Sequence, residues 1–262
     1  MGALILDPLA ALGRATIAGC REAGAVALFA LEALSHLFRP PFYWRLFWRA
    51  FVEVAWFSLP VVALTAVFTG MVLALQSYTG FARFNAQSTI ASVVVISLTR
   101  ELGPVLASLM VAGRIGASFA AEIGTMRVTD QIDALTTLST NPIKYLVTPR
   151  ILAATVALPL LVLVADILGV MGGWLIGTFK LGFVSVAYLK STFDYLVAED
   201  VVSGLVKAAV FGFIVSLMGT WCGYTSRGGA QGVGSATTTA VVASSILILA
   251  VDYVLTEIFF AQ

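Results

Sequence analysis

Apolar residues dominate five long stretches of the chain, and short polar connections separate them. A helix needs about 20 mostly apolar residues to cross a bilayer, and each stretch is long enough. We therefore expect an all-α integral membrane protein, whose single domain covers residues 1–262. The expected membrane-spanning helices are residues 54–78, 87–122, 150–179, 201–224 and 236–260.

Charged residues interrupt the second stretch at Arg100, Glu101 and Arg114. The pieces between these charges are too short to cross a bilayer separately. Gly103-Pro104 lies near the middle, and proline is a common cause of helix kinks. We expect one long helix that bends at this dipeptide.

The residues before the first span predict an amphipathic helix over 8–38. Asp7-Pro8 is typical of a helix start, and Arg39-Pro40-Pro41 is expected to end the helix. At about 100° per residue, its polar side chains fall on one narrow stripe. Such a helix lies in the membrane surface instead of crossing the bilayer. The stripe consists of Asp7, Arg14, Arg21, Glu32 and His36.

Aromatic residues alternate with Arg45 and Arg49 over residues 42–51. Aromatic rings and arginines together are typical of the boundary between bilayer and water, where the guanidinium groups meet lipid phosphates. We expect this segment to lie at the entry to the first span.

Between the second and third spans, the segment Glu122–Leu135 combines charge with an apolar spacing close to that of a helix. Its apolar positions are Ile123, Met126, Ile132 and Leu135, and its charged positions are Glu122, Arg127, Asp130 and Asp133. The pattern predicts a short helix within residues 123–140 on an aqueous side of the membrane. It fits either a binding site for a partner protein or an ordinary helix that rests on the bilayer surface.

Small residues recur every fourth position in two spans: Gly169, Gly173 and Gly177, and also Gly116, Ala120 and Gly124. This spacing lets helix backbones approach closely, within one chain or in a dimer. The glycine-rich segment Gly228–Gly234 lacks the lysine of a nucleotide-binding loop, and we expect it to form a flexible turn.

Composition excludes several classes of protein. Hydrophobic residues make up 60% of the chain and charged residues 11%, whereas soluble domains have about 25% charged residues. The net charge of +1, without a basic run, gives no reason to expect nucleic-acid binding.

With His36 as the only histidine and only Cys20 and Cys222, we expect no metal site, no disulfide framework and no catalytic triad. We also expect no cofactor and no cleaved signal peptide, because the first residues lack a basic region.

The distribution of Lys and Arg predicts the orientation. With a cytoplasmic N-terminus, nine lie on the inner side and three on the outer side. The inner set is Arg14, Arg21, Arg39, Arg45, Arg49, Arg127, Lys144, Arg150 and Arg227, and the outer set is Arg83, Lys180 and Lys190. We therefore expect the N-terminus inside, the C-terminus outside, and a short surface helix outside at residues 184–196.

Charges within membrane spans are costly and are usually paired or functional. Lys207 and Asp252 lie at matching depths, so we expect an ion pair between the fourth and fifth spans, either as an internal salt bridge or as part of a transport path. Arg100 and Glu101 are adjacent and point in different directions, which prevents simple mutual neutralisation and suggests a cavity wall. Asp166 is a further acid within the spans.

Several segments together resemble the MlaE/YrbE-type permeases, the membrane subunits of ABC transporters that work with MCE-domain proteins. The segments that carry the resemblance are Gly70–Gln76, Arg100–Val105, Ala112–Gly116, Ala121–Met126 with Gln131-Ile132, and Val251–Thr256. The similarity spans nearly the whole chain.

The resemblance implies a homodimer in the bacterial inner membrane that moves phospholipid between inner and outer membranes and maintains outer-membrane lipid asymmetry. Its implied partners are cytoplasmic ABC ATPase subunits, a periplasmic MCE-domain lipid-binding protein and a STAS-domain protein. The ATPase would hold a coupling helix, with Glu122, Ile123, Gly124, Met126, Arg127, Asp130 and Gln131 as contact candidates. The lipid cavity would use Leu73, Leu75, Tyr78, Arg100 and Glu101.

Three alternatives stay open: a permease for another lipid such as a sterol, a proton-linked carrier that uses Glu101, Asp166 and Asp252, and a membrane scaffold without transport. A nucleotide-hydrolysing partner or a lipid-sized cavity would separate the first from the others.

Overall fold

The computed structural model describes residues 2–37, 39–84 and 89–260, and these residues form helices and connections without a strand. Five helical runs are long and apolar enough to cross a membrane: α2 (Trp44–Phe81), residues 90–128, residues 143–179, α9 (Ala198–Tyr224) and α10 (Gly229–Phe260). With the N-terminal helix α1 (Gly2–His36), this confirms the expected all-α membrane protein. The start expected at residue 87 lies outside the described residues.

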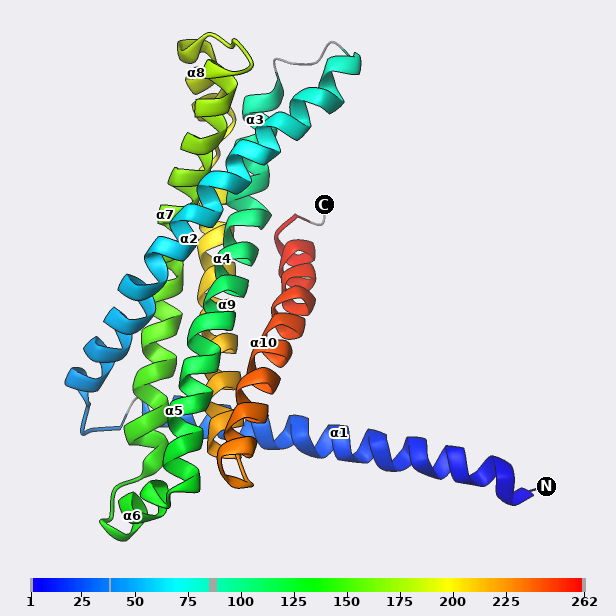
Figure 1. The fold of residues 1–262 in the computed structure, drawn as a ribbon, viewed down its shortest axis with the longest axis vertical. Helices are drawn as coiled ribbons and strands as arrows, with labels where there is room; N and C mark the ends of the chain where they lie inside the picture. Colours follow the sequence, from blue (N-terminus) through cyan, green and yellow to red (C-terminus); the bar gives the residue numbers. More distant parts are fainter. Residues whose placement is uncertain (1, 38, 85–88, 261–262) are drawn as a thin grey trace.

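The spanning helices form one elongated bundle, and α1 runs crosswise at one end of it (Figure 1). The short helix α6 (Gln131–Thr137) lies at that same end, whereas α8 (Ser185–Tyr195) lies at the opposite end. The bundle thus has two distinct polar ends, which we call the α6 end and the α8 end. Helix α8 occupies the place of the surface helix expected at residues 184–196.

Helix α1 begins at Gly2, so the expected start at Asp7-Pro8 is wrong. Residues 2–7 continue the helix on the N-terminal side of Pro8, whose missing N–H removes one helical hydrogen bond. Near its end, α1 buries Phe29 and Ala33 in an apolar cluster with residues of the connection before the third span and of α9. Among the described side chains of α1, the buried ones lie in this last part of the helix.

The second span is one continuous helical run with two π-helical turns. It consists of α3 (Ile90–Ser97), the π turn η3 (Leu98–Leu102), α4 (Gly103–Val111), the π turn η4 (Ala112–Gly116) and α5 (Ala117–Val128). A π turn inserts an extra residue and redirects the side chains around it, and such turns are frequent at functional sites. Here the two turns contain Arg100, Glu101 and Arg114.

The predicted helix Glu122–Leu135 is wrong as a single element. Helix α5 ends at Val128, and α6 begins at Gln131 after Asp130, whose backbone is left-handed with φ 57°. Aspartate tolerates this conformation better than most residues, and threonine is a weak helix former, so Thr129-Asp130 is a natural break. An ion pair of 2.7 Å between Arg127 and Asp133 spans the break.

The third run consists of the π turn η5 (Ile143–Val147) and α7 (Thr148–Phe179), and α7 packs closely against α2. A Cβ atom on Gly70 would lie 1.8 Å from the carbonyl oxygen of Gly169, and one on Gly172 would lie 2.4 Å from that of Val67. The two backbones therefore touch where the side chains are absent. Of the predicted small residues, Gly169 takes part in this contact, whereas Gly173 and Gly177 lie nearest Val94 and Tyr188.

The glycine-rich segment after α9 is mostly helical, which corrects the expected turn at Gly228–Gly234. Only Gly228 precedes α10, and Gly229 already starts it. A Cβ atom on Gly232 would lie 1.8 Å from the carbonyl oxygen of Arg227, so the sharp turn is compact rather than extended.

Candidate functional site

A buried cation ties three spanning helices together in the half of the bundle toward the α8 end. The side chain of Lys207 on α9 is 0% exposed, and its Nζ atom lies 2.8 Å from Glu101 Oε2 and 3.1 Å from Asp252 Oδ1 on α10. It also donates hydrogen bonds to Thr256 Oγ1 at 2.7 Å and to the carbonyl oxygen of Arg100 at 3.1 Å. The structure thus brings Lys207 and Asp252 together and adds Glu101 and Thr256 to the pair.

Arg100 points away from this cluster. Its Nε atom donates to Asp200 Oδ1 at 2.6 Å, and its guanidinium lies 4.3 Å from the centre of the Phe260 ring. Asp200 lies in the first turn of α9 and is 1% exposed. It was not among the residues singled out from the sequence, although an acid in the first turn of a helix is a recognisable signal.

A pocket of about 580 Å³ lies beside this arginine. Its lining combines one cation and one acid with aromatic and small side chains, and it consists of Arg100, Ala198, Glu199, Val202, Ser203, Phe259 and Phe260. Such a mixture suits a ligand with a polar head and an apolar body. We call it the Arg100 pocket.

The other expected cavity residues lie elsewhere in the single copy. Leu73 and Tyr78 of α2 pack against an apolar cluster that contains Ala74, Ile90 and Leu98. Leu75 is half-buried on α2, and Glu101 faces Lys207. Of the five residues expected to line the lipid cavity, the Arg100 pocket within one chain therefore contains only Arg100.

The residues expected to contact a partner protein divide into two groups. Ile123 and Gly124 are buried inside the bundle, whereas Asp130 and Gln131 are exposed and Met126 is half-buried. At the tip beyond α6, Leu138 exposes 74% of its surface. A surface that a partner can reach is therefore centred on α6 rather than on the end of α5.

Two ion pairs hold this end of the bundle. Glu122 on α5 pairs with Arg150 on α7 at 2.7 Å, and Arg127 pairs with Asp133. A small pocket of about 290 Å³ lies between the α5–α6 break and the connection from α9 to α10. Its lining includes Ser226 and Arg227. The sequence marks Arg227 only as one of the inner-side cations, because the connection shows no amphipathic periodicity.

Asp166 on α7 is buried, and its Oδ1 atom has no hydrogen-bond partner among the described residues. A Cβ atom on Gly103 would lie 2.0 Å from this oxygen, so the carboxyl group contacts the backbone just after the π turn η3. No ion pair connects it to the Lys207 cluster within the described chain.

We expect Asp166→Asn to raise the free energy of unfolding by about 1 kcal/mol or more, because the amide keeps the shape and avoids the desolvation of a carboxyl group. Unfolding in detergent would measure this difference. The matched control is Asp194→Asn on the exposed face of α8, which should change stability by less than about 0.5 kcal/mol. A loss of stability in Asp166→Asn would contradict the view that this carboxyl group lacks a compensating partner.

This chain is similar to known membrane permeases over nearly its whole length. The profile of the family described as Permease MlaE matches residues 47–258. A "Probable ABC transporter permease protein" of Rickettsia felis is 60% identical over 98% of this chain and 99% of its own length. A protein with the same description from Synechocystis is 43% identical over 78% of this chain and 77% of its length. The Arabidopsis thaliana protein TRIGALACTOSYLDIACYLGLYCEROL 1, chloroplastic, is 37% identical over 90% of this chain and 67% of its length.

Proposed function

This chain belongs to the MlaE permease family, and from this premise we propose that it moves phospholipid between the inner and outer membranes of a Gram-negative envelope. It would do so as the membrane subunit of an ABC transporter and thereby help to maintain outer-membrane lipid asymmetry. ATP hydrolysis would take place in a separate partner subunit.

The observation that carries this proposal is the continuous helical run of residues 90–128. The C-terminal part of this run ends beside α6 at the α6 end. Its η3 turn places Arg100 in the lining of the Arg100 pocket and places Glu101 against Lys207. A rigid element with a protein-binding tip at one end and a ligand pocket along its length is suited to relay motion. Movement of α6 by an ATPase would thus reach the pocket directly.

The pocket supports a phospholipid as the ligand. The Arg100 guanidinium pairs with Asp200 through Nε and can offer its Nη groups to a phosphate, and Phe259 and Phe260 provide an apolar wall for acyl chains. The name of the Arabidopsis relative contains a diacylglycerol lipid, which agrees with a lipid substrate. We propose that a second copy of the chain completes the cavity and brings in Leu73, Leu75, Tyr78 and Glu101.

The remaining partners and the orientation follow from this proposal. The α6 end, with the basic α1 and α2 segments, faces the cytoplasm, and the C-terminus faces the periplasm. ATPase subunits bind the cytoplasmic end, with a STAS-domain protein attached to them. An MCE-domain lipid-binding protein sits over the α8 end. The protein would thus lie in the inner membrane as a single multi-pass domain.

Isolation of the complex from its native membrane tests this proposal. We expect subunit mass spectrometry to find two copies of this chain, an ABC ATPase and an MCE-domain protein, and lipid mass spectrometry to find bound phospholipid. A complex without a nucleotide-hydrolysing subunit would overturn the proposal. Transport that continued without such a subunit would instead favour a proton-linked carrier.

Helix α6 offers a specific prediction. We expect Leu138→Asp to abolish co-purification of the ATPase, or to lower it at least about tenfold, because docking would bury a carboxylate without a partner in place of an apolar side chain. Pull-down of the ATPase on the tagged permease measures the effect. The control is Phe179→Asp, which places the same change on an 81% exposed residue at the other end of the molecule. Equal ATPase recovery from Leu138→Asp and wild type would contradict docking on α6.

A further inference from the structure

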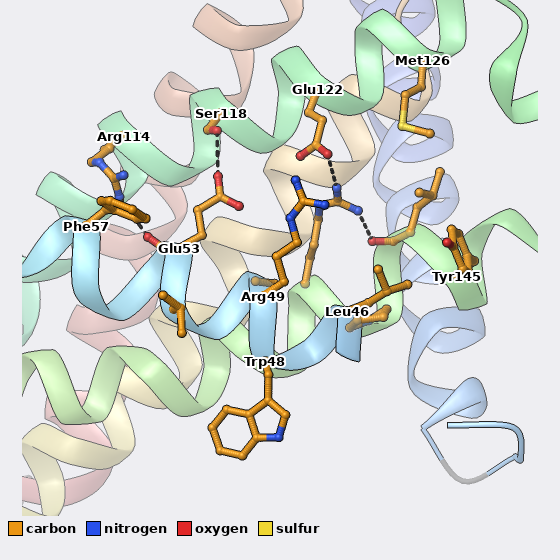
Figure 2. Close-up of a pocket in the computed structure, with 15 residues that line it drawn as sticks. Leu46, Trp48, Arg49, Glu53, Phe57, Arg114, Ser118, Glu122, Met126 and Tyr145 are labelled. Atoms are coloured by element: carbon orange, nitrogen blue, oxygen red, sulfur yellow. Dashed lines mark hydrogen bonds and ion pairs between the residues drawn. The ribbon is translucent and has the colours of Figure 1, made fainter. Parts of the chain in front are cut away.

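A second and larger cavity lies between the start of α2, the α5 helix and the start of α7. Its volume is about 1070 Å³, which is sufficient for a small amphiphilic ligand. It does not share a lining residue with the Arg100 pocket. Figure 2 shows the side chains of α2 and α5 facing each other across it. We call it the α2–α5 cavity.

Three arginines and two glutamates line this cavity: Arg49, Arg114, Arg150, Glu53 and Glu122. Arg150 and Glu122 neutralise each other at 2.7 Å. Glu53 Oε1 accepts a hydrogen bond from Ser118 at 3.3 Å. The lining thus carries one more cation than anion.

The two remaining guanidinium groups have no carboxylate within 4 Å in the part of the chain that the structure describes. Arg114 donates to the carbonyl oxygen of Glu53 at 3.1 Å and to Ser58 Oγ at 2.9 Å, and it lies 5.7 Å from the centre of the Phe57 ring. Arg49 extends from α2 toward the α5 helix that carries Glu122 (Figure 2). A half-buried guanidinium with only neutral acceptors still favours an anion.

The cavity lies at the level of the membrane surface at the α6 end. The first turns of α2 form a ladder of aromatic contacts that includes Trp44, Phe47, Trp48 and Phe51. Such rings mark the depth of lipid headgroups. Arg114 lies eight residues before Glu122 in the same helical run, which corresponds to about 12 Å deeper. Cations are therefore placed at the headgroup depth and about two helical turns below it.

We propose that the α2–α5 cavity binds the phosphate-bearing headgroup of one glycerophospholipid from the surrounding leaflet. Arg49 contacts the phosphate at the rim, Arg114 contacts the glycerol ester oxygens deeper in the cavity, and Phe57 flanks the acyl chains. In the proposed orientation this is the cytoplasmic leaflet. The site goes beyond the proposed function, because it requires neither the ATPase nor a direction of transport.

The test uses a tryptophan placed at Phe57, which lines the cavity beside Arg114, because the ring of Trp48 points away from α5 (Figure 2). The full chain is placed in phosphatidylcholine vesicles that contain increasing fractions of phosphatidylglycerol brominated near the headgroup end of its chains. The reporter signal is the difference between Phe57→Trp and the wild type, which have the other tryptophans in common. We expect the Phe57→Trp reporter to be quenched at a lower fraction of brominated phosphatidylglycerol than of brominated diacylglycerol.

The variant Arg49→Gln should need about tenfold more brominated phosphatidylglycerol for the same quenching, because one charge-assisted phosphate contact is lost. The matched control is Arg45→Gln, which removes an exposed arginine of the same helix that does not line the cavity, and its curve should match the wild type. Arg49→Lys should recover part of the difference.

Three results would overturn this site: an unchanged curve for Arg49→Gln, equal quenching by brominated diacylglycerol, or absence of quenching because a second copy covers the cavity. Displacement of the lipid by millimolar sn-glycerol 3-phosphate would assign the cavity to a soluble phosphate ester and overturn the lipid assignment. None of these quenching measurements depends on ATP-driven transport. A negative result would therefore overturn the lipid site without overturning the proposed function.

Discussion

Replacement of Lys207 by methionine is expected to lower the free energy of unfolding by about 3 kcal/mol, because the variant leaves two carboxylates without their shared cation. Lys207 is fully buried, whereas Glu101 and Asp252 are 36% and 18% exposed, so the acids regain part of their solvation. For this reason we expect the lower end of the range of about 3–5 kcal/mol that is typical of a broken buried pair. Equilibrium unfolding in detergent measures the change.

The combined variant Lys207→Met, Glu101→Gln, Asp252→Asn is the decisive control. It removes all three charges and keeps the approximate side-chain volumes, so most of the lost stability should return. Thr256 also hydrogen-bonds Glu101 Oε1 at 3.0 Å, and it can do the same with a glutamine. If the single and combined variants are equally unstable, the loss comes from packing around α9 and not from unpaired acids.

The membrane-spanning helices were predictable from the sequence because the thickness of a bilayer imposes a minimum apolar length that soluble helices do not need. The same argument predicted the continuous second span, whereas the surface helix near Ser185–Tyr195 was expected from its place in an outer connection. Their boundaries differ by several residues, since helices such as α2 continue past the apolar core into the aromatic boundary region.

The break between α5 and α6 was not predictable from periodicity. Apolar residues on both sides, such as Met126 and Ile132, keep a nearly helical spacing across Thr129-Asp130, so the pattern alone does not reveal a left-handed residue. The composition of the dipeptide was the available signal, because both residues are weak helix formers.

The site was predictable only in part. Depth estimates along straight helices place Lys207 near Asp252, but they do not show that Glu101 joins them. The π turn at residues 98–102 redirects Glu101, and its i to i+5 hydrogen bonds leave no signature in the sequence. The α2–α5 cavity joins Arg49 and Arg114 from separate spans, and single-sequence patterns do not report such tertiary contacts.

The second large effect is expected at the contact of α2 with α7. Gly70→Ala should lower the free energy of unfolding by about 3 kcal/mol, the upper end of the usual cost of overpacking. The added methyl group would lie 1.8 Å from the carbonyl oxygen of Gly169 and 2.7 Å from its carbonyl carbon, and a rigid backbone does not move aside as a side chain does. The two helices must therefore separate, and they lose the close packing that holds them in lipid.

Gly80→Ala separates this steric effect from the helix propensity of alanine. Gly80 lies in the same helix, but a Cβ atom there meets nothing within 4 Å. Alanine favours a helix over glycine by up to about 1 kcal/mol, so this control should be neutral or slightly stabilising. Unfolding of both variants in the same detergent gives the comparison. If Gly70→Ala proves as stable as Gly80→Ala, the α2 and α7 backbones are not in contact at Gly169, and the small-residue spacing of α7 serves another neighbour.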